Sequence, residues 1–170
     1  MSSEYYYLTA SLPHLTFKTE PPFSKERFLD ECEKWLSRGD LESLLAADNA
    51  EEARAGNSQV LAKWKEFDLS LKKELAEYRR ERRGGTERKP GNLAGKVLSA
   101  ANPLEMELSL ERARWDYLDD LAVGHFFDIG KLIVYYLQLG ILVRLAKFDK
   151  DKGETYYYEM GEVKYDNALR

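Results

Sequence analysis

Residues 132–143 read LIVYYLQLGILV, and this stretch decides the fold. Every position except Gln138 and Gly140 carries an apolar or aromatic side chain. A helix that is apolar on all sides is normally buried on all sides. The pattern predicts a last long helix over about residues 128–150, and we expect this helix to be the centre of the core. Because glycine has no side chain, we also expect a neighbouring element to approach the helix closely at Gly140.

Amphipathic patterns predict further helices before the central one. Asn102 and Pro103 indicate a helix start, because asparagine is a favoured N-cap and proline is favoured at the first helical position. The helix that follows carries an apolar stripe that includes Trp115. A long amphipathic helix is expected over about residues 58–83, and a shorter one after Ser24.

Shorter segments are less regular. Residues 5–13, YYYLTASLP, predict either a short strand or a helix that ends near the proline. Asp40 is expected to cap a short helix, LESLLAA. Glycine, proline and basic residues at about 83–95 predict a mobile basic loop. Residues 156–163, YYYEMGEV, predict a strand or an extended segment.

Composition agrees with a helical bundle. The chain has 170 residues, of which 44% are hydrophobic and 33% charged, with only five prolines. This balance is typical of a globular protein rich in amphipathic helix, and the length fits one domain of ordinary size. We therefore expect a single all-α domain over residues 1–170, a helical bundle of about five to six helices.

Several classes of function are disfavoured. The single cysteine, Cys32, excludes an internal disulfide and, with only two histidines, argues against a zinc site. The net charge of -4 gives no overall attraction to DNA or anionic lipid. The N-terminal sequence lacks the pattern of a signal peptide, and an apolar run of 12 residues is too short to span a bilayer. We expect a cytoplasmic protein without direct membrane insertion.

Three stretches together resemble a known family. They are YYYLTASLP at residues 5–13, NPLEMELSLERARWDYLDDL at 102–121, and GHFFDIGKLIVYYLQLGILVRLAKFDKDKGE at 124–154. The pattern resembles that of an uncharacterised bacterial family whose genes lie among those for subunits of V/A-type rotary ATPases. A weaker similarity is to the rotor-coupling subunit of those ATPases, the all-helical, funnel-shaped protein that couples the central rotor shaft to the membrane ring. The rotor-coupling subunit is about twice as long, so the chain is expected to resemble only part of it.

The resemblance implies a non-catalytic accessory or structural protein. It would act through protein–protein contacts with subunits of a V/A-type ATPase, either as a component like the rotor-coupling subunit or in assembly. Such a protein would lie at the membrane periphery through the ATPase complex. The resemblance brings no catalytic residues, and we expect no cofactor, no bound metal and no small-molecule substrate.

Two kinds of residue are predicted to contact the partner. Residues 79–89 carry six bases, which are either a solvated helix end favoured by the helix dipole or a contact for an acidic protein surface. Tyrosines suit interfaces because they combine a large area with one polar group. Three consecutive tyrosines cannot all face a core, so at least one in each YYY triplet is expected to be exposed. The predicted contact residues are Arg79, Arg80, Arg82, Arg83, Tyr6 and Tyr157.

Two other functions compete with this interpretation. The first is an RNA-binding adaptor that uses residues 79–89, although acids interrupt the run and no aromatic platform lies within it. The second is a metal-dependent hydrolase that uses the acids of residues 105–120, although adjacent acids on a helix point in different directions. Arg114, beside Trp115, is expected to have a buried role, either tying helices together or meeting a partner. His125 is expected to bond a carbonyl in a turn between two helices.

Overall fold

The computed structural model describes residues 5–48, 58–84, 95, 97 and 102–148. All regular elements in these residues are helical, so the predicted all-α class is confirmed. The elements are α1 (Tyr6–Ser11), α2 (Lys25–Glu33), α3 (Arg38–Leu45), α4 (Gln59–Arg83), α6 (Pro103–Ala122), α7 (Ile129–Leu145) and the 3-10 turn η1 (Ala146–Phe148). Most of the loop predicted at about 83–95, and the segment at 156–163, lie outside the described residues; Arg83 is the last residue of α4.

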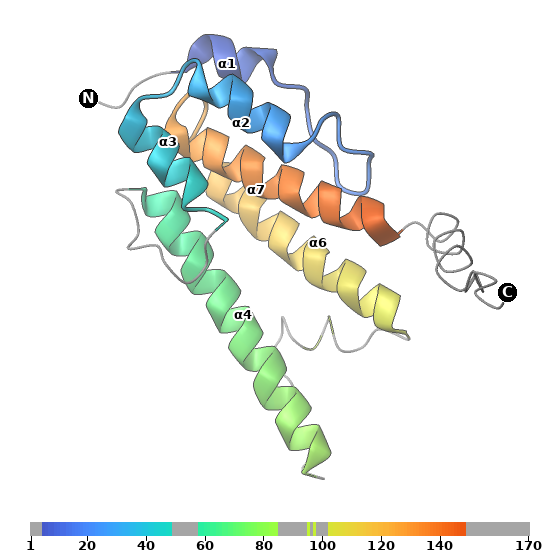
Figure 1. Ribbon diagram of the computed structural model, residues 1–170. Helices are drawn as coiled ribbons and strands as arrows, with labels where there is room; N and C mark the ends of the chain where they lie inside the picture. The colour runs from blue at the N-terminus through green and yellow to red at the C-terminus, as the bar shows by residue number, and fades with distance from the viewer. Residues whose placement is uncertain (1–4, 49–57, 85–94, 96, 98–101, 149–170) are drawn as a thin grey trace, which may run out of the picture.

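Helix α7 lies at the centre of the bundle. It contacts α2, α3, α4 and α6, and Figure 1 shows α6 beside it as an antiparallel neighbour. Leu132, Ile133 and Leu139 on α7 are fully buried. Phe28 of α2 stacks on the ring of Tyr136 with a centroid distance of 5.8 Å. The apolar sequence of α7 therefore corresponds to contacts on most of its sides.

The stretch Ile129–Phe148 is long and apolar enough to cross a membrane by length and composition. It is longer than the 12-residue run considered above, because the first turn of α7 and η1 extend it. In the structure 56% of its apolar window is buried inside the bundle. More than half of the stretch therefore packs against other helices, as expected of a core helix.

Side-chain caps set most of the helix starts. The Oδ1 atom of Asn102 accepts a hydrogen bond from the backbone N–H of Glu105 at 2.8 Å, and Pro103 is the first residue of α6. Ser24 and Ser58 cap α2 and α4 in the same way. These caps satisfy backbone donors that have no partner within the helix.

The predicted cap of the short helix was wrong. Ser37 caps α3, and its Oγ atom accepts from the backbone N–H of Asp40 at 3.3 Å. Asp40 lies in the first turn, where a carboxylate is favoured by the helix dipole. Its Oδ2 atom accepts from the hydroxyls of Tyr5 and Ser37. Gly39, which follows the expected end of the preceding helix, is itself inside α3.

Replacing Asn102 with alanine is expected to lower the free energy of unfolding by about 0.5–2 kcal/mol, because the cap of α6 is lost. Urea unfolding of the full chain measures the change. Asn102→Asp is the matched control, since it retains an oxygen that can accept from Glu105 N–H. Equal stability of the alanine and aspartate variants would contradict the role of the cap.

Candidate partner-binding surface

The N-terminal tyrosines have different environments. Tyr5 is 8% exposed; its hydroxyl donates to Asp40 at 2.5 Å, and its backbone N–H donates to the carbonyl of Phe127 at 2.5 Å. These bonds hold the start of α1 against α3 and the α6–α7 turn. The next two residues point outward, with Tyr6 49% and Tyr7 81% exposed. The expectation that a YYY triplet leaves a ring exposed is therefore met at this end of the chain.

Exposed apolar side chains gather around these tyrosines. Tyr6 packs on Phe127 with a centroid distance of 4.5 Å, and Tyr7 stacks on Trp35 at 6.3 Å. Phe126 is 70% exposed beside Phe127 in the α6–α7 turn. We call this set the aromatic end surface. Its members are Tyr6, Tyr7, Trp35, Val123, Phe126 and Phe127.

The α6–α7 turn is held by specific contacts. Gly124 has a φ of +87°, a conformation that favours glycine, directly after α6. The Nδ1 atom of His125 lies 2.5 Å from Oδ2 of Asp128, the residue that caps α7. The imidazole also lies on Gly130, where a Cβ atom would come within 2.5 Å of Nδ1. His125 thus bonds a carboxylate rather than the expected carbonyl, and the turn is fixed with Phe126 outward.

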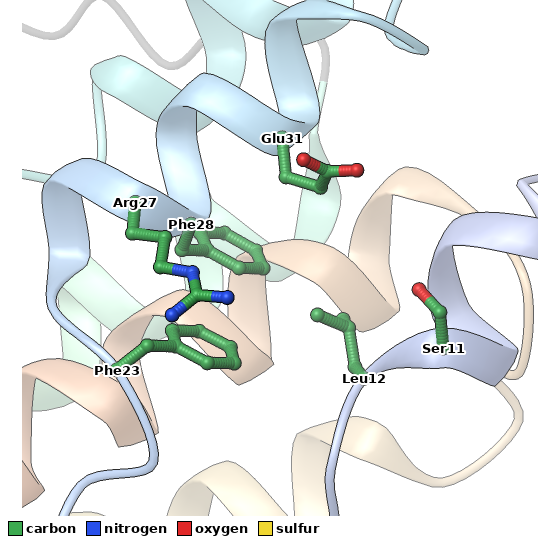
Figure 2. Close-up of a pocket in the computed structure, with 6 residues that line it drawn as sticks. All are labelled: Ser11, Leu12, Phe23, Arg27, Phe28 and Glu31. Atoms are coloured by element: carbon green, nitrogen blue, oxygen red, sulfur yellow. The ribbon is translucent and has the colours of Figure 1, made fainter.

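A groove adjoins the Tyr7–Trp35 pair between α1 and α2. It has a volume of about 250 Å³ and is lined by Ser11, Leu12, Phe23, Arg27, Phe28 and Glu31. Figure 2 shows Leu12 and Ser11 on one side and Arg27 and Glu31 on the other. Ser11 lies one turn after Tyr7 on α1, and Glu31 lies one turn before Trp35, so the groove continues from the aromatic pair.

Of the two charged residues that line this groove, Glu31 has an ion-pair partner within the described part of the chain and Arg27 does not. Glu31 is paired with Lys34 at 2.5 Å. The guanidinium of Arg27 is exposed and has no hydrogen bond or ion pair among the residues that the structure describes. A free arginine beside aromatic rings is typical of contact surfaces, because arginine and aromatic residues are enriched there.

Arg114 lies in a buried charge network. Its Nη2 atom donates to Asp68 of α4 at 2.8 Å, and its Nη1 atom donates to Glu111 at 2.8 Å. Arg144 of α7 lies 3.3 Å from the same Glu111 oxygen and also bonds Glu107. The network joins α4, α6 and α7, so Arg114 ties helices together, the first of the two roles expected for it.

Burial governs the ionisation of this network. Burial raises the pKa of Glu111, and the nearby Arg114 and Arg144 act in the opposite direction. The pKa of Arg114 is raised by the carboxylates of Glu111 and Asp68 although its burial opposes this. The guanidinium therefore stays charged inside the bundle.

Trp115 and Gly140 were also singled out in the sequence, and both lie beside residues from other parts of the bundle. Trp115 is 4% exposed and meets the ring of Phe17 edge-on at 5.6 Å. At Gly140 the nearest atom to an added Cβ would be Nζ of Lys25, at 3.9 Å. The expected close approach of another element is absent there; among the described residues it occurs at Gly130, against His125.

The basic end of α4 lies apart from the tyrosines. Arg79, Arg80 and Arg83 are exposed near the end of α4, which Figure 1 shows extending beyond the bundle at the opposite end from α1. A helix of 25 residues is about 37 Å long, and the start of α4, not its end, is near α3. The segments that carry these arginines and Tyr6 therefore lie at opposite ends of the bundle, and the role of both as partner contacts stays a prediction. The side chain of Arg82, and Tyr157, lie outside the described residues.

Three of the six acids in residues 105–120 are paired with arginines among the residues that the structure describes. Arg112 and Asp116 form an exposed pair at 2.8 Å, and Glu107 and Glu111 face Arg144 and Arg114. Within the described part of the chain, no group of three or more histidine, cysteine or acidic residues is arranged to hold a metal ion. The acids that pair with Arg144 therefore help to hold the helices together.

The α6–α7 hairpin carries a family match. Residues 95–164 match the model of a family described as protein of unknown function (DUF2764). No curated protein and no solved structure matches the chain. The matched region contains the α6 and α7 members of the Arg114 network, but not Asp68 of α4, and three members of the aromatic end surface, Val123, Phe126 and Phe127.

Sequence reasoning found only Tyr6 of the aromatic end surface. Trp35 follows α2, which ends at Glu33, and its ring is 52% exposed. The available signal for the rest was the pair Phe126 and Phe127 directly after a glycine turn. Large apolar residues in a turn are unusual enough to indicate a contact surface.

Proposed function

We propose that the chain is a non-catalytic accessory protein that binds other protein subunits through the aromatic end surface. One observation carries the proposal: six apolar side chains, each between 39% and 81% exposed, belong to three segments that meet at one end of the bundle. Exposed apolar residues scattered singly are ordinary, but a contiguous group indicates an interaction site. Tyrosine, tryptophan and phenylalanine are also the residues that most often anchor interfaces.

The partner that we propose is a component of a V/A-type rotary ATPase. The support is the resemblance of residues 5–13, 102–121 and 124–154 to the family encoded among ATPase subunits, together with the weaker similarity to the rotor-coupling subunit. In this proposal the protein acts like part of the rotor-coupling subunit or in assembly of the complex. Its location at the membrane periphery would follow from that partner.

The exposed arginines of α4 have a different proposed role from the aromatic residues. Charges at the edge of an interface mainly accelerate encounter, whereas buried aromatic anchors slow dissociation. Arg79, Arg80 and Arg83 lie at the far end of the bundle, outside the aromatic end surface, so in this proposal they form a second contact with an acidic region of the partner and mainly affect the rate of encounter. The alternative is an RNA-binding adaptor that uses these bases. It is disfavoured because the largest group of exposed rings that could stack on bases, on α1 and the α6–α7 turn, lies away from the end of α4.

The test is binding of reconstituted ATPase subcomplexes to the immobilised full chain at two ionic strengths. Combined Tyr7→Ser and Phe126→Ser replacement is expected to raise the off-rate about tenfold or more, since loss of an anchor costs at least about 1.4 kcal/mol. Leu69→Ser is the matched control, because Leu69 is 54% exposed but lies on α4. Reversing the three arginines to glutamate is expected to slow association and flatten its salt dependence.

The outcomes separate the parts of the proposal. Absence of binding to every subcomplex would refute the ATPase partner. Binding with an unchanged off-rate in the Tyr7 and Phe126 variant would refute the aromatic end surface. Salt-sensitive binding of RNA that is abolished by the arginine reversal would favour the adaptor instead.

A further inference from the structure

A polar cavity lies between α1, the segment that follows it, and the α6–α7 hairpin. Its volume is about 190 Å³, and its lining includes Thr9, Asp119, Lys131, Tyr135 and Gln138. None of these residues belongs to the aromatic end surface or to the Arg114 network. The cavity is therefore a separate feature of the fold.

Gln138 is the polar residue within the apolar run of α7. It is 7% exposed, and its Nε2 atom donates to Oδ1 of Asp119 at 2.7 Å. Tyr135, one turn earlier, lines the same cavity and donates its hydroxyl to the carbonyl of Pro13 at 3.0 Å. The most apolar helix of the chain thus presents polar groups on the side that lines this cavity.

The hydroxyl of Thr9 is buried without a hydrogen-bond partner. Its Oγ1 atom is the only buried side-chain nitrogen or oxygen in this condition among the described residues. A buried hydroxyl without a partner is destabilising, so such groups normally meet a protein atom, a water molecule or a ligand. Thr9 lines the same cavity as Gln138.

Opposite charges line the cavity without pairing. Lys131 and Asp119 form no ion pair with each other, and the ammonium of Lys131 has no partner among the residues that the structure describes. The second carboxylate oxygen of Asp119 is not used by Gln138. A molecule with one negative and one positive group could satisfy both side chains at once.

We propose that this cavity binds a small zwitterion of the size of a free amino acid. Its carboxylate would pair with Lys131 and its ammonium with Asp119, while Thr9 and Gln138 would bond its remaining polar atoms. The volume of about 190 Å³ is sufficient for a molecule of this size, since about 10–15 Å³ of such space already holds one water molecule. The proposal does not depend on the identity of the protein partner.

The test is titration of the isotopically labelled full chain with glycine, L-alanine and L-serine, followed by NMR. At least one of these zwitterions is expected to give saturable shifts at Thr9, Lys131 and Gln138. Acetate and ethanolamine, which carry one charge each, are expected to bind at least tenfold more weakly, because a charge-assisted bond is lost in each case.

Conservative variants locate the binding. Lys131→Gln and Asp119→Asn are each expected to weaken zwitterion binding at least tenfold; asparagine retains an oxygen that can accept from Gln138. Lys34→Gln, an exposed position that does not line the cavity, is the control and is expected to leave binding unchanged. The dispersed spectrum of each variant verifies folding independently of binding.

Two results would overturn the proposal. One is the lack of saturable shifts at Thr9, Lys131 and Gln138 with all three zwitterions. The other is binding that is as strong for acetate or ethanolamine as for the zwitterions, or that survives both conservative variants.

Discussion

Replacing Leu139 with aspartate is expected to unfold the protein. Leu139 is fully buried in the middle of α7, the helix around which the bundle packs. An unpaired carboxylate at that site costs several kcal/mol, against a total stability of about 5–15 kcal/mol for a domain of this kind. Circular dichroism is expected to show loss of helix and of a cooperative thermal transition at neutral pH.

Leu137→Asp is the matched control, two residues away on the same helix. Leu137 is only half-buried and lines an open cavity, so a carboxylate at this position can reach solvent. This variant is expected to keep a cooperative melt with a lower midpoint. Equal damage from the two substitutions would contradict the placement of α7 in the core.

Replacing Arg114 with methionine is expected to destabilise the protein by about 3–5 kcal/mol, the usual cost of removing one partner from a buried ion pair. The change leaves the carboxylates of Glu111 and Asp68 without their shared guanidinium; the side chain of Glu111 is 2% exposed. Chemical unfolding of the full chain measures the effect. Arg112→Met is the control: its pair with Asp116 is exposed, so a loss within about 1 kcal/mol is expected.

The cost of Arg114→Met should also depend on pH. Burial raises the pKa of Glu111, and removing Arg114 takes away a charge that opposes this rise. In the variant, the folded protein therefore retains the Glu111 proton at pH values where the unfolded chain has released it. Stability then falls as pH rises from the ordinary glutamate value near 4.5 to the raised folded pKa. The cost is expected to be smaller at pH 5 than at pH 8, and the reverse order would contradict this account.

Much of the fold could be predicted because its signals are local. The apolar run of α7 requires burial wherever the helix lies. The caps at Ser24, Ser58 and Asn102 depend only on residues within one turn. The cap of α3 was misplaced because serine and aspartate are both good caps and stand three residues apart. The Tyr5 hydroxyl, from a distant segment, accepts from the backbone N–H of Ser37 and donates to Asp40, and no local pattern indicates this contact.

The aromatic end surface could not be predicted because it is assembled from distant segments. Neither the exposure of Trp35 nor the contact of Tyr6 with Phe127 follows from helical periodicity. The same holds for the cavity, since Gln138 and Thr9 lie far apart in the chain. The separation of Tyr6 from Arg79 also depends on the direction of α4, which no local pattern specifies.

Site-specific photo-crosslinking tests the central claim most directly. A photoreactive phenylalanine analogue is placed at Tyr7, at Phe126 or, as a control, at Lys73 on the exposed side of α4, and each full chain is irradiated with purified V/A-type ATPase subcomplexes. Crosslinks to one ATPase component are expected from positions 7 and 126 and not from position 73. Absence of crosslinks from both aromatic positions, or equal crosslinking from position 73, would contradict the claim that the aromatic end surface binds the partner.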